Sequence, residues 1–417
     1  MSTLYDRTAN AVWLYRQSVE EGQLSDLYYD PWDVEIDLDP YPVYRRLRDE
    51  APLYHNERHD FWGISRYTDV DAALRDPQRL SSAKGDILEV VKTDPVMPPG
   101  VFINEDPPLH SIHRALVSRA FMPKKMKALE DKVRAFCAAC LDPLVGGETF
   151  DFVRDLGAEL PMKTIGMLVG IPDADQPSVR AEAHRVLRNT PGEPLPVKKD
   201  HYFDGDMFTD YVKWRKKNPS DDLITELLAV EFEDQSGMTR RLSTGELLIF
   251  LAVIAGAGVE TTGRLFGWMG KVLAEHPDQR QEIVEDRSLI PSAIEELLRY
   301  EPPGPHVARY VSQEVEFHGQ TVPAGSALLL MLASANRDER QFDDPDRFDI
   351  RRKAGGHLTF GRGAHFCLGA PLARLEGRIA LDEVLNRFPK WDIDIDSARR
   401  SRTATVRGWD TMPAIVS

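Results

Sequence analysis

One predicted helix, between residues 242 and 277, limits what this chain can fold into more than any other stretch. Residues 242–246 read Leu-Ser-Thr-Gly-Glu, which has the form of a capping box, and the next break is the His-Pro pair at 276–277. At the usual rise per residue this helix is about 50 Å long. A helix of that length crosses a whole domain, so the other elements must pack around it.

Small residues interrupt this helix near its middle. Residues 255–262 read Ala-Gly-Ala-Gly-Val-Glu-Thr-Thr. Glycine is costly in a helix compared with alanine, and a threonine hydroxyl can bond back to the preceding turn and bend the axis. Close packing against another helix would explain the glycines, but it requires neither Glu260 nor Thr261. We therefore expect a locally widened helix beside a functional site.

The second distinctive stretch is a glycine-rich loop with a lone cysteine. Residues 360–369 read Phe-Gly-Arg-Gly-Ala-His-Phe-Cys-Leu-Gly, and a helix is predicted to begin directly afterwards. The thiolate of Cys367 would then face unpaired N–H groups and the positive end of the helix dipole. The glycines allow the backbone to approach a flat, bulky group closely. A buried structural cysteine is the alternative, but the pattern favours a thiolate that holds a metal from one side, as haem iron is held.

Both stretches resemble motifs of the cytochromes P-450. The cysteine loop matches every fixed position of the family's haem-binding pattern, Phe-Gly-x-Gly-x-His-x-Cys-x-Gly, and residues 257–262 match its oxygen-binding helix, Ala-Gly-x-Asp/Glu-Thr-Thr. The motifs occur in the family's order from about Pro40 to the end of the chain. The resemblance implies a fold that is mainly α with a smaller β-rich part (α+β). It implies a single catalytic domain over residues 1–417, with haem b (iron protoporphyrin IX) between the long helix and the helix after the cysteine loop.

The resemblance also assigns roles to individual residues. Cys367 is implied as the axial ligand of the haem iron, and Glu260 and Thr261 as the catalytic acid–alcohol pair. Thr261 would hydrogen-bond the bound dioxygen or a water beside it, and Glu260 would be the proton route from solvent. The implied cofactor contacts are His110, Arg114, Ala257, Gly258, Arg309, Phe360, Gly361, His365, Cys367 and Gly369. Those at the positions of the two propionates are His110, Arg114, Arg309 and His365.

A buried ion network is implied beside the cysteine loop. Residues 296–299 match the family's Glu-x-x-Arg, and residues 345–348 match its Pro-x-Arg-Phe element. By the resemblance, Glu296 is held between Arg299 and Arg347 by bidentate, charge-assisted bonds. Such a network would support the fold and position the loop, without taking part in catalysis.

The residues that the resemblance places around the substrate are mostly apolar: Ile87, Leu88, Val91, Val253, Gly256, Pro305, Val307 and Val406. Such a lining predicts a hydrophobic substrate with few polar anchors. Gly256, if it faces the haem, would leave room for a bulky terpenoid, steroid, lipid or aromatic molecule. His306 is either a polar anchor for the substrate or a histidine on the surface of a strand.

Charge and cysteine content exclude several classes of protein. The formal net charge of −15 argues against a nucleic-acid-binding protein. Residues 1–15 lack the pattern of a signal peptide, and the longest apolar run, residues 247–257, is too short to span a membrane. Three cysteines suit the reducing cytoplasm. Cys137 and Cys140 form a Cys-x-x-Cys, which we interpret as two small core residues of a helix, since no second pair completes a zinc site.

The resemblance implies a monomeric monooxygenase that inserts one atom of O2 into a hydrophobic small molecule. Its electrons would come from an iron–sulfur ferredoxin and an NAD(P)H-dependent reductase, since no flavin or ferredoxin segment follows. An acidic ferredoxin would meet basic residues on the cysteine side, namely Arg114, Lys124, Lys125, Arg362 and Arg374. Two alternatives stay open: a peroxide-driven haem-thiolate enzyme, for which the family replaces the acid–alcohol pair, and a haem-binding sensor or carrier without turnover.

The remaining pattern predicts where helices and strands lie. We expect an extended arm to about residue 38, helices from residue 107 to about 217, and an irregular loop over residues 78–105. Helices are also expected at 40–48, 68–75, 291–300 and 370–388, and strands at 53–55, 61–65, 311–332, 391–395 and 403–406.

Overall fold

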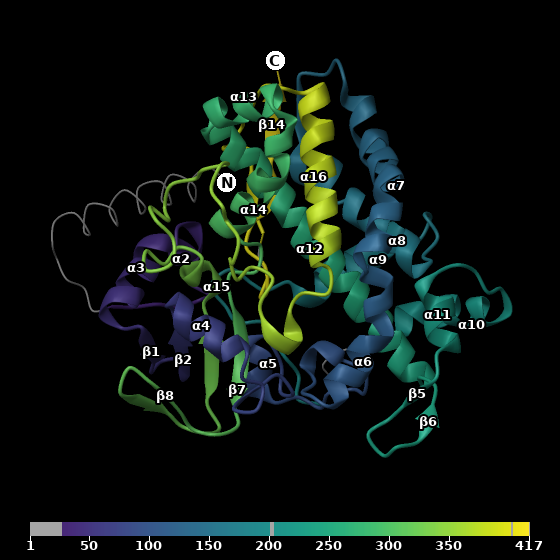
Figure 1. Ribbon diagram of the computed structural model, residues 1–417, viewed down its shortest axis with the longest axis vertical. Helices are drawn as coiled ribbons and strands as arrows, with labels where there is room; N and C mark the ends of the chain where they lie inside the picture. Colours follow the sequence, from purple (N-terminus) through teal and green to yellow (C-terminus); the bar gives the residue numbers. More distant parts are fainter. Residues whose placement is uncertain (1–26, 201–203, 402, 417) are drawn as a thin grey trace.

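A computed structural model describes residues 27–200, 204–401 and 403–416. Its central element is α12 (Thr244–Glu275), which lies in the middle of the helical part with α7 (Pro123–Leu141) and α16 (Ala370–Arg387) nearby (Figure 1). The expected capping box is confirmed, because Ser243 Oγ accepts from the Glu246 N–H (3.2 Å) and a Glu246 carboxylate oxygen accepts from the Ser243 N–H (2.7 Å). The rest of the described chain packs around this helix.

The other α-helices are short to medium in length; several contact α12, and others lie beside the main sheet. They are α2 Val34–Leu38, α3 Tyr41–Glu50, α4 Tyr67–Leu74, α5 Leu88–Thr93, α6 Leu109–Ser118, α8 Leu160–Val169, α9 Gln176–Leu187, α10 Thr209–Lys217, α11 Leu223–Ala229, α13 Pro277–Glu285, α14 Ile290–Tyr300 and α15 Leu332–Ala335. A π-helical turn, Phe152–Gly157, precedes α8.

The strands gather mainly in a sheet on the side of the molecule away from α7 and α16 (Figure 1). Its order is β1-β2-β10-β7-β3, in which β10 runs parallel to β2 and the other pairs are antiparallel. Its strands are β1 Leu53–Asn56, β2 Phe61–Ile64, β3 Leu80–Ser81, β7 Val307–Val311 and β10 Ala327–Leu330. The smaller sheets use β4 Thr149–Asp151, β5 Phe232–Glu233, β6 Thr239–Arg240, β8 Val315–Phe317, β9 Gln320–Val322, β11 Trp391–Ile393, β12 Arg399–Arg400, β13 Trp409–Thr411 and β14 Pro413–Val416. The expected α+β fold is confirmed.

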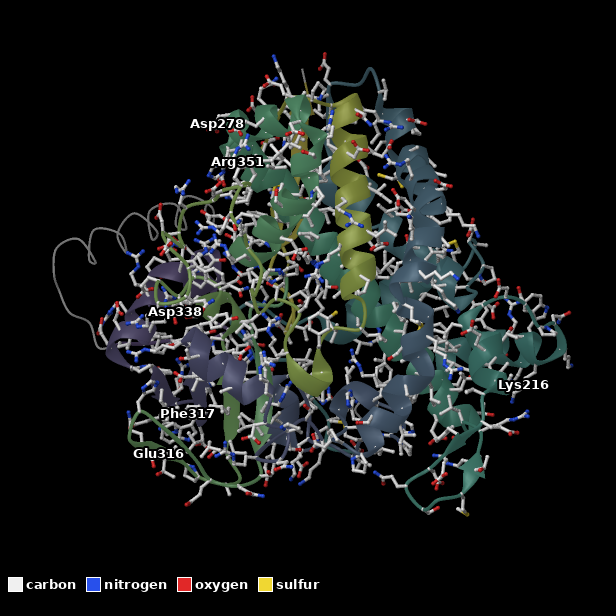
Figure 2. The ribbon with its side chains drawn as sticks, viewed as in Figure 1. Lys216, Asp278, Glu316, Phe317, Asp338 and Arg351 are labelled. Atoms are coloured by element: carbon white, nitrogen blue, oxygen red, sulfur yellow. The ribbon has the colours of Figure 1, made fainter. Side chains whose placement is uncertain are left out.

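The main apolar core follows α12, and a second one covers the five-stranded sheet. By length and composition α12 could cross a membrane, but 67% of its most apolar window is buried inside the fold, as suits a core helix. Charged residues cover the outside, as Figure 2 shows for Lys216 at the end of α10 and Asp278 at the start of α13. Cys137 lies in the main core on α7 and Cys140 packs against it, and no cluster of metal-ligating side chains occurs in the described ranges.

One carboxyl group lies inside the main core. Glu376 of α16 is only 1% exposed, and its Oε1 has no hydrogen-bond partner among the described residues. Burial raises the pKa of Glu376 to about 8, against a smaller lowering by a hydrogen bond with Thr164 of α8. This group is therefore an uncharged acid at neutral pH.

Three local predictions need correction. Residues 403–406 form no strand, because Thr403 Oγ1 bonds to the backbone of Val406 and closes a compact turn; an isolated bridge to Arg188 is all that remains. The helix α12 is not widened: it stays α-helical throughout, and Thr261 Oγ1 donates to the Ala257 carbonyl (2.9 Å) without breaking it. The loop over residues 78–105 is partly ordered into β3 and α5. Of the expected arm, residues 1–26 lie outside the described chain.

Candidate active site

The middle of α12 borders an open space instead of packed side chains. Ala257 and Thr261, four residues apart and therefore on one helix face, are exposed, and Gly256 is half-buried. Neighbours on the other faces, such as Val259 and Thr262, are buried. A Cβ added to Gly256 would have no described atom within 4 Å. The small residues thus leave room on the face that carries the Thr261 hydroxyl.

The cysteine loop is folded by its glycines. Gly361 and Gly363 adopt left-handed φ angles of 66° and 65°, and a Cβ on Gly363 would lie 2.7 Å from the Leu74 carbonyl oxygen. The loop is closed by a bond from the Cys367 N–H to the Phe360 carbonyl (2.7 Å), and α16 begins three residues later. Substitution at either glycine would therefore displace the cysteine.

Burial raises the pKa of the Cys367 thiol, and the N–H groups of Gly369 and Ala370 and the charge of Arg114 oppose that rise. The expectation that the helix start alone would favour a thiolate is therefore only partly met. The helix start supplies the opposing donors, but removal from water outweighs them. A bound metal cation removes this penalty, because a thiol that coordinates a metal is deprotonated. The arrangement is suited to a metal-bound sulfur.

Two buried histidines lie against each other beside this loop. The ring centroids of His110 on α6 and His365 are 4.0 Å apart. Both nitrogens of His110 and Nε2 of His365 are buried without hydrogen-bond partners in the described chain. Burial, followed by the nearby cations Arg309 and Arg114, lowers the pKa of His365 to about 3. Unpaired buried nitrogens are costly, so this cluster requires acceptors from a bound group.

Two arginines complete this cluster. Arg309 on β7 is buried, and its guanidinium bonds to the Ala308 carbonyl (2.8 Å), while no carboxylate within the described residues forms an ion pair with it. Burial lowers the pKa of Arg309. Arg114 on α6 is half-buried and donates to the Phe366 carbonyl, which connects α6 to the cysteine loop. The two arginines make this edge of the cysteine loop cationic, and the neutral histidines add unpaired ring nitrogens to it.

The buried network around Glu296 is present, but its second arginine was assigned wrongly. Arg299 forms a bidentate pair with Glu296 (2.7 and 2.8 Å), and both side chains are fully buried. The second cation is Arg352, whose Nε lies 3.1 Å from the same carboxylate. Arg347 is 58% exposed and pairs with Asp344 and Asp349 (2.8 and 3.2 Å).

The chain path explains this correction. The turn after residue 344 directs the Arg347 side chain to solvent, while its carbonyl oxygen accepts from Arg299 (3.4 Å) and Arg352 (3.1 Å). The network reaches the cysteine loop through Asn336, whose carbonyl accepts from Arg299 (2.9 Å) and whose side chain accepts from the Leu358 N–H (2.6 Å). The predicted role in positioning the loop thus has a physical path, through residues that the motifs did not mark.

Glu260 begins a chain of ion pairs that ends at the surface. Its Oε2 lies 2.9 Å from Arg264 Nη2, one turn further along α12, and Arg264 Nη1 lies 3.2 Å from Asp410 on β13. Asp410 also pairs with Arg188 and with His184 of α9 (3.5 Å). Burial raises the pKa of Asp410, but the hydrogen bond from His184 and the charges of Arg264 and Arg188 outweigh that effect, so the net pKa is lowered. Sequence spacing could have shown the Glu260–Arg264 pair; it could not have found Asp410.

Known proteins are similar to this chain in sequence and in fold. The family profile of cytochrome P-450 matches residues 202–404. Putative cytochrome P-450 123 of Mycobacterium tuberculosis (strain ATCC 25618 / H37Rv) is 39% identical over 396 residues, which cover 94% of this chain and 97% of the relative. The chain belongs to the cytochrome P-450 superfamily. It is of the bacterial type, and like its relatives it is a haem-thiolate monooxygenase.

Two further comparisons support this assignment of the cytochrome P-450. Vitamin D(3) 25-hydroxylase of Pseudonocardia autotrophica is 35% identical, with 90% of this chain and 93% of the relative covered. The crystal structure of CYP109E1 from Bacillus megaterium in complex with testosterone gives a TM-score of 0.81 at 29% identity, with 92% of this chain and 99% of that chain covered. The family implies a haem-iron cofactor, external redox partners and a small-molecule substrate.

The residues of this cytochrome P-450 fit haem. The sulfur of Cys367 offers a ligand, and the small-residue face of α12 offers room for a flat ring. Two propionates would supply acceptors for the unpaired nitrogens of His110 and His365 and a counter-charge for Arg309. These are the positions at which the sequence predicted cofactor contacts.

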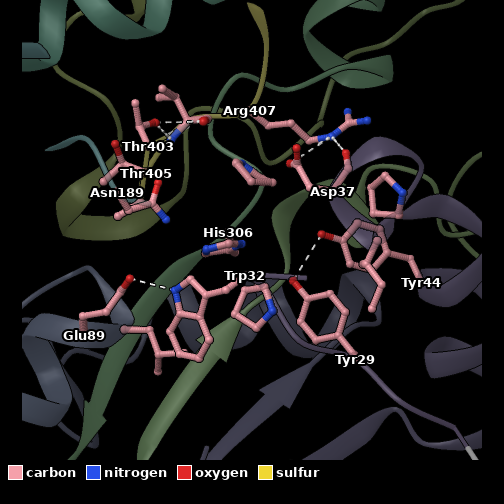
Figure 3. Close-up of a pocket in the computed structure, with 17 residues that line it drawn as sticks. Tyr29, Trp32, Asp37, Tyr44, Glu89, Asn189, His306, Thr403, Thr405 and Arg407 are labelled. Carbon is pink, nitrogen blue, oxygen red and sulfur yellow. Dashed lines mark hydrogen bonds and ion pairs between the residues drawn. The ribbon is translucent and has the colours of Figure 1, made fainter. Parts of the chain in front are cut away.

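The eight predicted substrate-lining residues do not all meet in one cavity. Leu88, Pro305 and Val406 line a common pocket, shown in Figure 3. The residues outside its lining are Ile87, Val91, Val253, Gly256 and Val307. Ile87, Val91 and Val253 are buried, while Gly256 borders the open space beside α12. The predicted lining residues therefore divide between this pocket and other parts of the fold.

Proposed function

We propose that this cytochrome P-450 inserts one oxygen atom of O2 into a hydrophobic small molecule, using electrons from an iron–sulfur ferredoxin and its NAD(P)H-dependent reductase. The observation that carries the proposal is the exposed Thr261 hydroxyl on the open face of α12, next to a carboxylate that is linked to the surface. Haem b, bound by Cys367, would supply oxygen binding and activation, with the thiolate donating electron density. Thr261 and Glu260 would supply the protons that this chemistry consumes.

The geometry suggests how the protons are delivered. Thr261 Oγ1 donates to the Ala257 carbonyl, so its own lone pairs face the open space and can accept a proton donor there. Arg264 stays protonated and therefore cannot carry a proton itself. Its Nη2 donates to Glu260 Oε2 (2.9 Å), and a turn of the Glu260 side chain away from Arg264 would let the carboxyl group of Glu260 carry a proton inward from water. The acid–alcohol pair also favours O2 over peroxide as oxidant.

For the substrate we propose a molecule with a hydrophobic body, such as a steroid or terpenoid. The predicted lining is apolar, and a Cβ added to Gly256 would have no described atom within 4 Å. The names of the similar vitamin D(3) hydroxylase and of the testosterone complex agree with this class. A residue with a large side chain at position 256 would fill that space, so Gly256→Phe should abolish binding of bulky substrates while smaller ones still bind.

For the electron donor we propose an acidic ferredoxin that docks on the cysteine side. Several cations of this face already have partners: Lys125 with Glu226 (2.7 Å), Arg362 with Asp71 (3.3 Å) and Arg374 with Glu295 (2.6 Å). Lys124 is exposed and forms no ion pair with the described residues. It therefore offers the least neutralised charge to a partner. We further propose that the chain acts as a single-domain, cytoplasmic monomer.

The test compares electron sources on the purified haem protein. Product formation and oxygen uptake should require NADH, reductase and ferredoxin together, and peroxide alone should give little product. Carbon monoxide added to the reduced protein should give the red-shifted absorption of a thiolate-bound haem, which Cys367→Ala should lose. Peroxide turnover equal to the ferredoxin-driven rate would favour the peroxide-driven alternative. A lack of oxygen uptake with every substrate tried would favour a sensor or carrier.

A further inference from the structure

The pocket that contains Leu88, Pro305 and Val406 has a built polar interior. It is a cavity of about 50 Å³ between the segment before α3, α5, the loop before β7 and the turn at residues 403–407. Figure 3 shows His306 near its centre, above the rings of Trp32 and Tyr29 and to the left of Tyr44. A space of this size holds a polar group and a few neighbouring atoms. It takes the end of a molecule and not a whole substrate.

The charged groups of the cavity already have partners. Glu89 Oε1 accepts from Trp32 Nε1 (2.8 Å) and from the Leu195 N–H (2.9 Å). Arg407 pairs with Glu301 and donates to the Asp37 carbonyl (2.9 Å). These bonds fix the walls, and no uncompensated charge is left to attract an ion. A ligand for this cavity is therefore uncharged.

Two buried polar atoms of residues that line the cavity have no hydrogen-bond partner in the described chain. They are His306 Nδ1 and Asn189 Oδ1, and both are buried. Asn189 Nδ2 donates to the Glu193 carbonyl (3.0 Å), which fixes the orientation of the amide and leaves Oδ1 to accept. Burial lowers the pKa of His306 to about 4, so the ring is neutral at pH 7 and can either donate or accept at Nδ1. The cavity thus offers one acceptor and one adaptable nitrogen.

A hydroxyl group matches this pair better than other polar groups do. It can accept from His306 Nδ1–H and donate to Asn189 Oδ1, directly or through one water. A ketone can only accept, so it leaves Asn189 unsatisfied. A carboxylate would be buried beside Glu89, and the cation that lines the cavity, Arg407, is already paired with Glu301. The surrounding rings and Leu88 favour an apolar body next to that hydroxyl.

We propose that this cavity binds the hydroxyl-bearing end of an otherwise hydrophobic substrate, with His306 as the specificity-determining residue and Asn189 as its partner. The inference rests on the proposed function, since it names the class of molecule that the monooxygenase takes. It makes the substrate an amphipathic alcohol and separates it from ketones, acids and plain hydrocarbons. Nothing in the family motifs marks either residue.

The test uses three probes with one skeleton: trans-4-cyclohexylcyclohexanol, 4-cyclohexylcyclohexanone and bicyclohexyl. Their dissociation constants from the haem-loaded protein are measured by equilibrium dialysis, which does not depend on turnover. Wild type should bind the alcohol about tenfold more tightly than bicyclohexyl, as expected for a hydrogen bond to a buried group. The ketone should lie between them. His306→Phe should reduce the preference for the alcohol to less than about twofold.

Further variants separate hydrogen bonding from loss of structure. His306→Gln keeps a donor and an acceptor and should retain part of the preference, while Asn189→Leu should make the alcohol and the ketone bind alike. The matched control is His55→Phe, because His55 stacks on Trp62 of β2 (4.3 Å) and does not line the cavity; its preference should equal that of wild type. Haem absorption with carbon monoxide confirms an intact site in each variant. If His306→Phe does not fold, the Gln and Asn189 variants decide.

Equal binding of the alcohol and the hydrocarbon by wild type would overturn the inference, as would a preference that survives in His306→Phe. Failure of the alcohol to bind up to its solubility limit would do the same. These results leave the proposed function standing if ferredoxin-driven oxygen uptake continues with another substrate. Conversely, a preference for the alcohol in a protein that shows no ferredoxin-driven oxygen uptake with any substrate would support the cavity and contradict the proposed function.

Discussion

Replacing Glu376 by glutamine should make the protein less sensitive to alkaline pH. Glutamine keeps the size of the side chain and stays uncharged, whereas Glu376 must ionise inside the core as the pH rises. Burial raises the pKa of Glu376 from 4.5 to about 8. Because the folded state holds this proton more tightly than the unfolded state, the stability contributed by the group is complete below pH 4.5. It is lost as the pH rises towards 8.

The size of the effect follows from the two pKa values. Between pH 6 and pH 9 the carboxyl of the unfolded chain is ionised throughout, while that of the folded chain changes from protonated to mostly ionised. Each unit of pKa difference corresponds to about 1.4 kcal/mol. Over this range the free energy of unfolding of wild type should therefore fall by about 3 kcal/mol more than that of Glu376→Gln. Titrations shared by both proteins cancel in the comparison.

Two measurements check this prediction. Urea-induced unfolding of both proteins at pH 6 and pH 9 gives the difference in free energy directly. Infrared absorption of the protonated carboxyl should show a band that disappears near pH 8 in wild type and is absent from the glutamine variant. Unfolding curves that shift equally with pH, or a carboxyl band that is already lost at pH 6, would refute the reasoning.

Three other substitutions test the site. Arg352→Ala should lower the free energy of unfolding by about 3 kcal/mol, because it leaves part of the buried Glu296 carboxylate unpaired. Arg347→Ala on the surface should lower it by less than about 0.5 kcal/mol. Urea unfolding compares the two variants, and equal losses would restore Arg347 as the second partner of Glu296. Thr261→Ala should lower product formation about 10- to 100-fold while oxygen uptake continues, and Thr261→Ser should recover most of it; equal activity of all three proteins would exclude the hydroxyl from proton delivery. Lys124→Glu should raise the KM for ferredoxin several-fold at low salt and much less at high salt, and a change that does not depend on salt would exclude an electrostatic contact.

The parts of this molecule that the sequence predicted well are those whose reason is local. The capping box of α12 and the left-handed turns at Gly361 and Gly363 are features of adjacent residues, so the local sequence identifies them. The second cation of Glu296 is different. Arg347 matches the motif, but the path of the following turn brings Arg352 inward and sends Arg347 to solvent. The conformation of the residues between Arg347 and Arg352 determines which arginine reaches Glu296, and no short sequence motif predicts that conformation.

The cavity around His306 shows the same limit more strongly. Its walls come from five separate segments of the chain, so neither its volume nor its unpaired atoms can be deduced from spacing. The false strand at residues 403–406 has a related cause. Its threonines and valine suit a strand, but Thr403 uses its hydroxyl to bond within the segment instead of leaving the backbone free to pair.

Glu89 Oε1 accepts two hydrogen bonds, and this has a consequence for how a molecule could enter the cavity. One oxygen atom holds both Trp32, which precedes α2, and the Leu195 amide, which follows α9. Outward movement of either segment breaks its own hydrogen bond to this oxygen, so both bonds resist widening of the cavity. A molecule too large for the cavity would therefore have to break at least one of them before it could enter from this side.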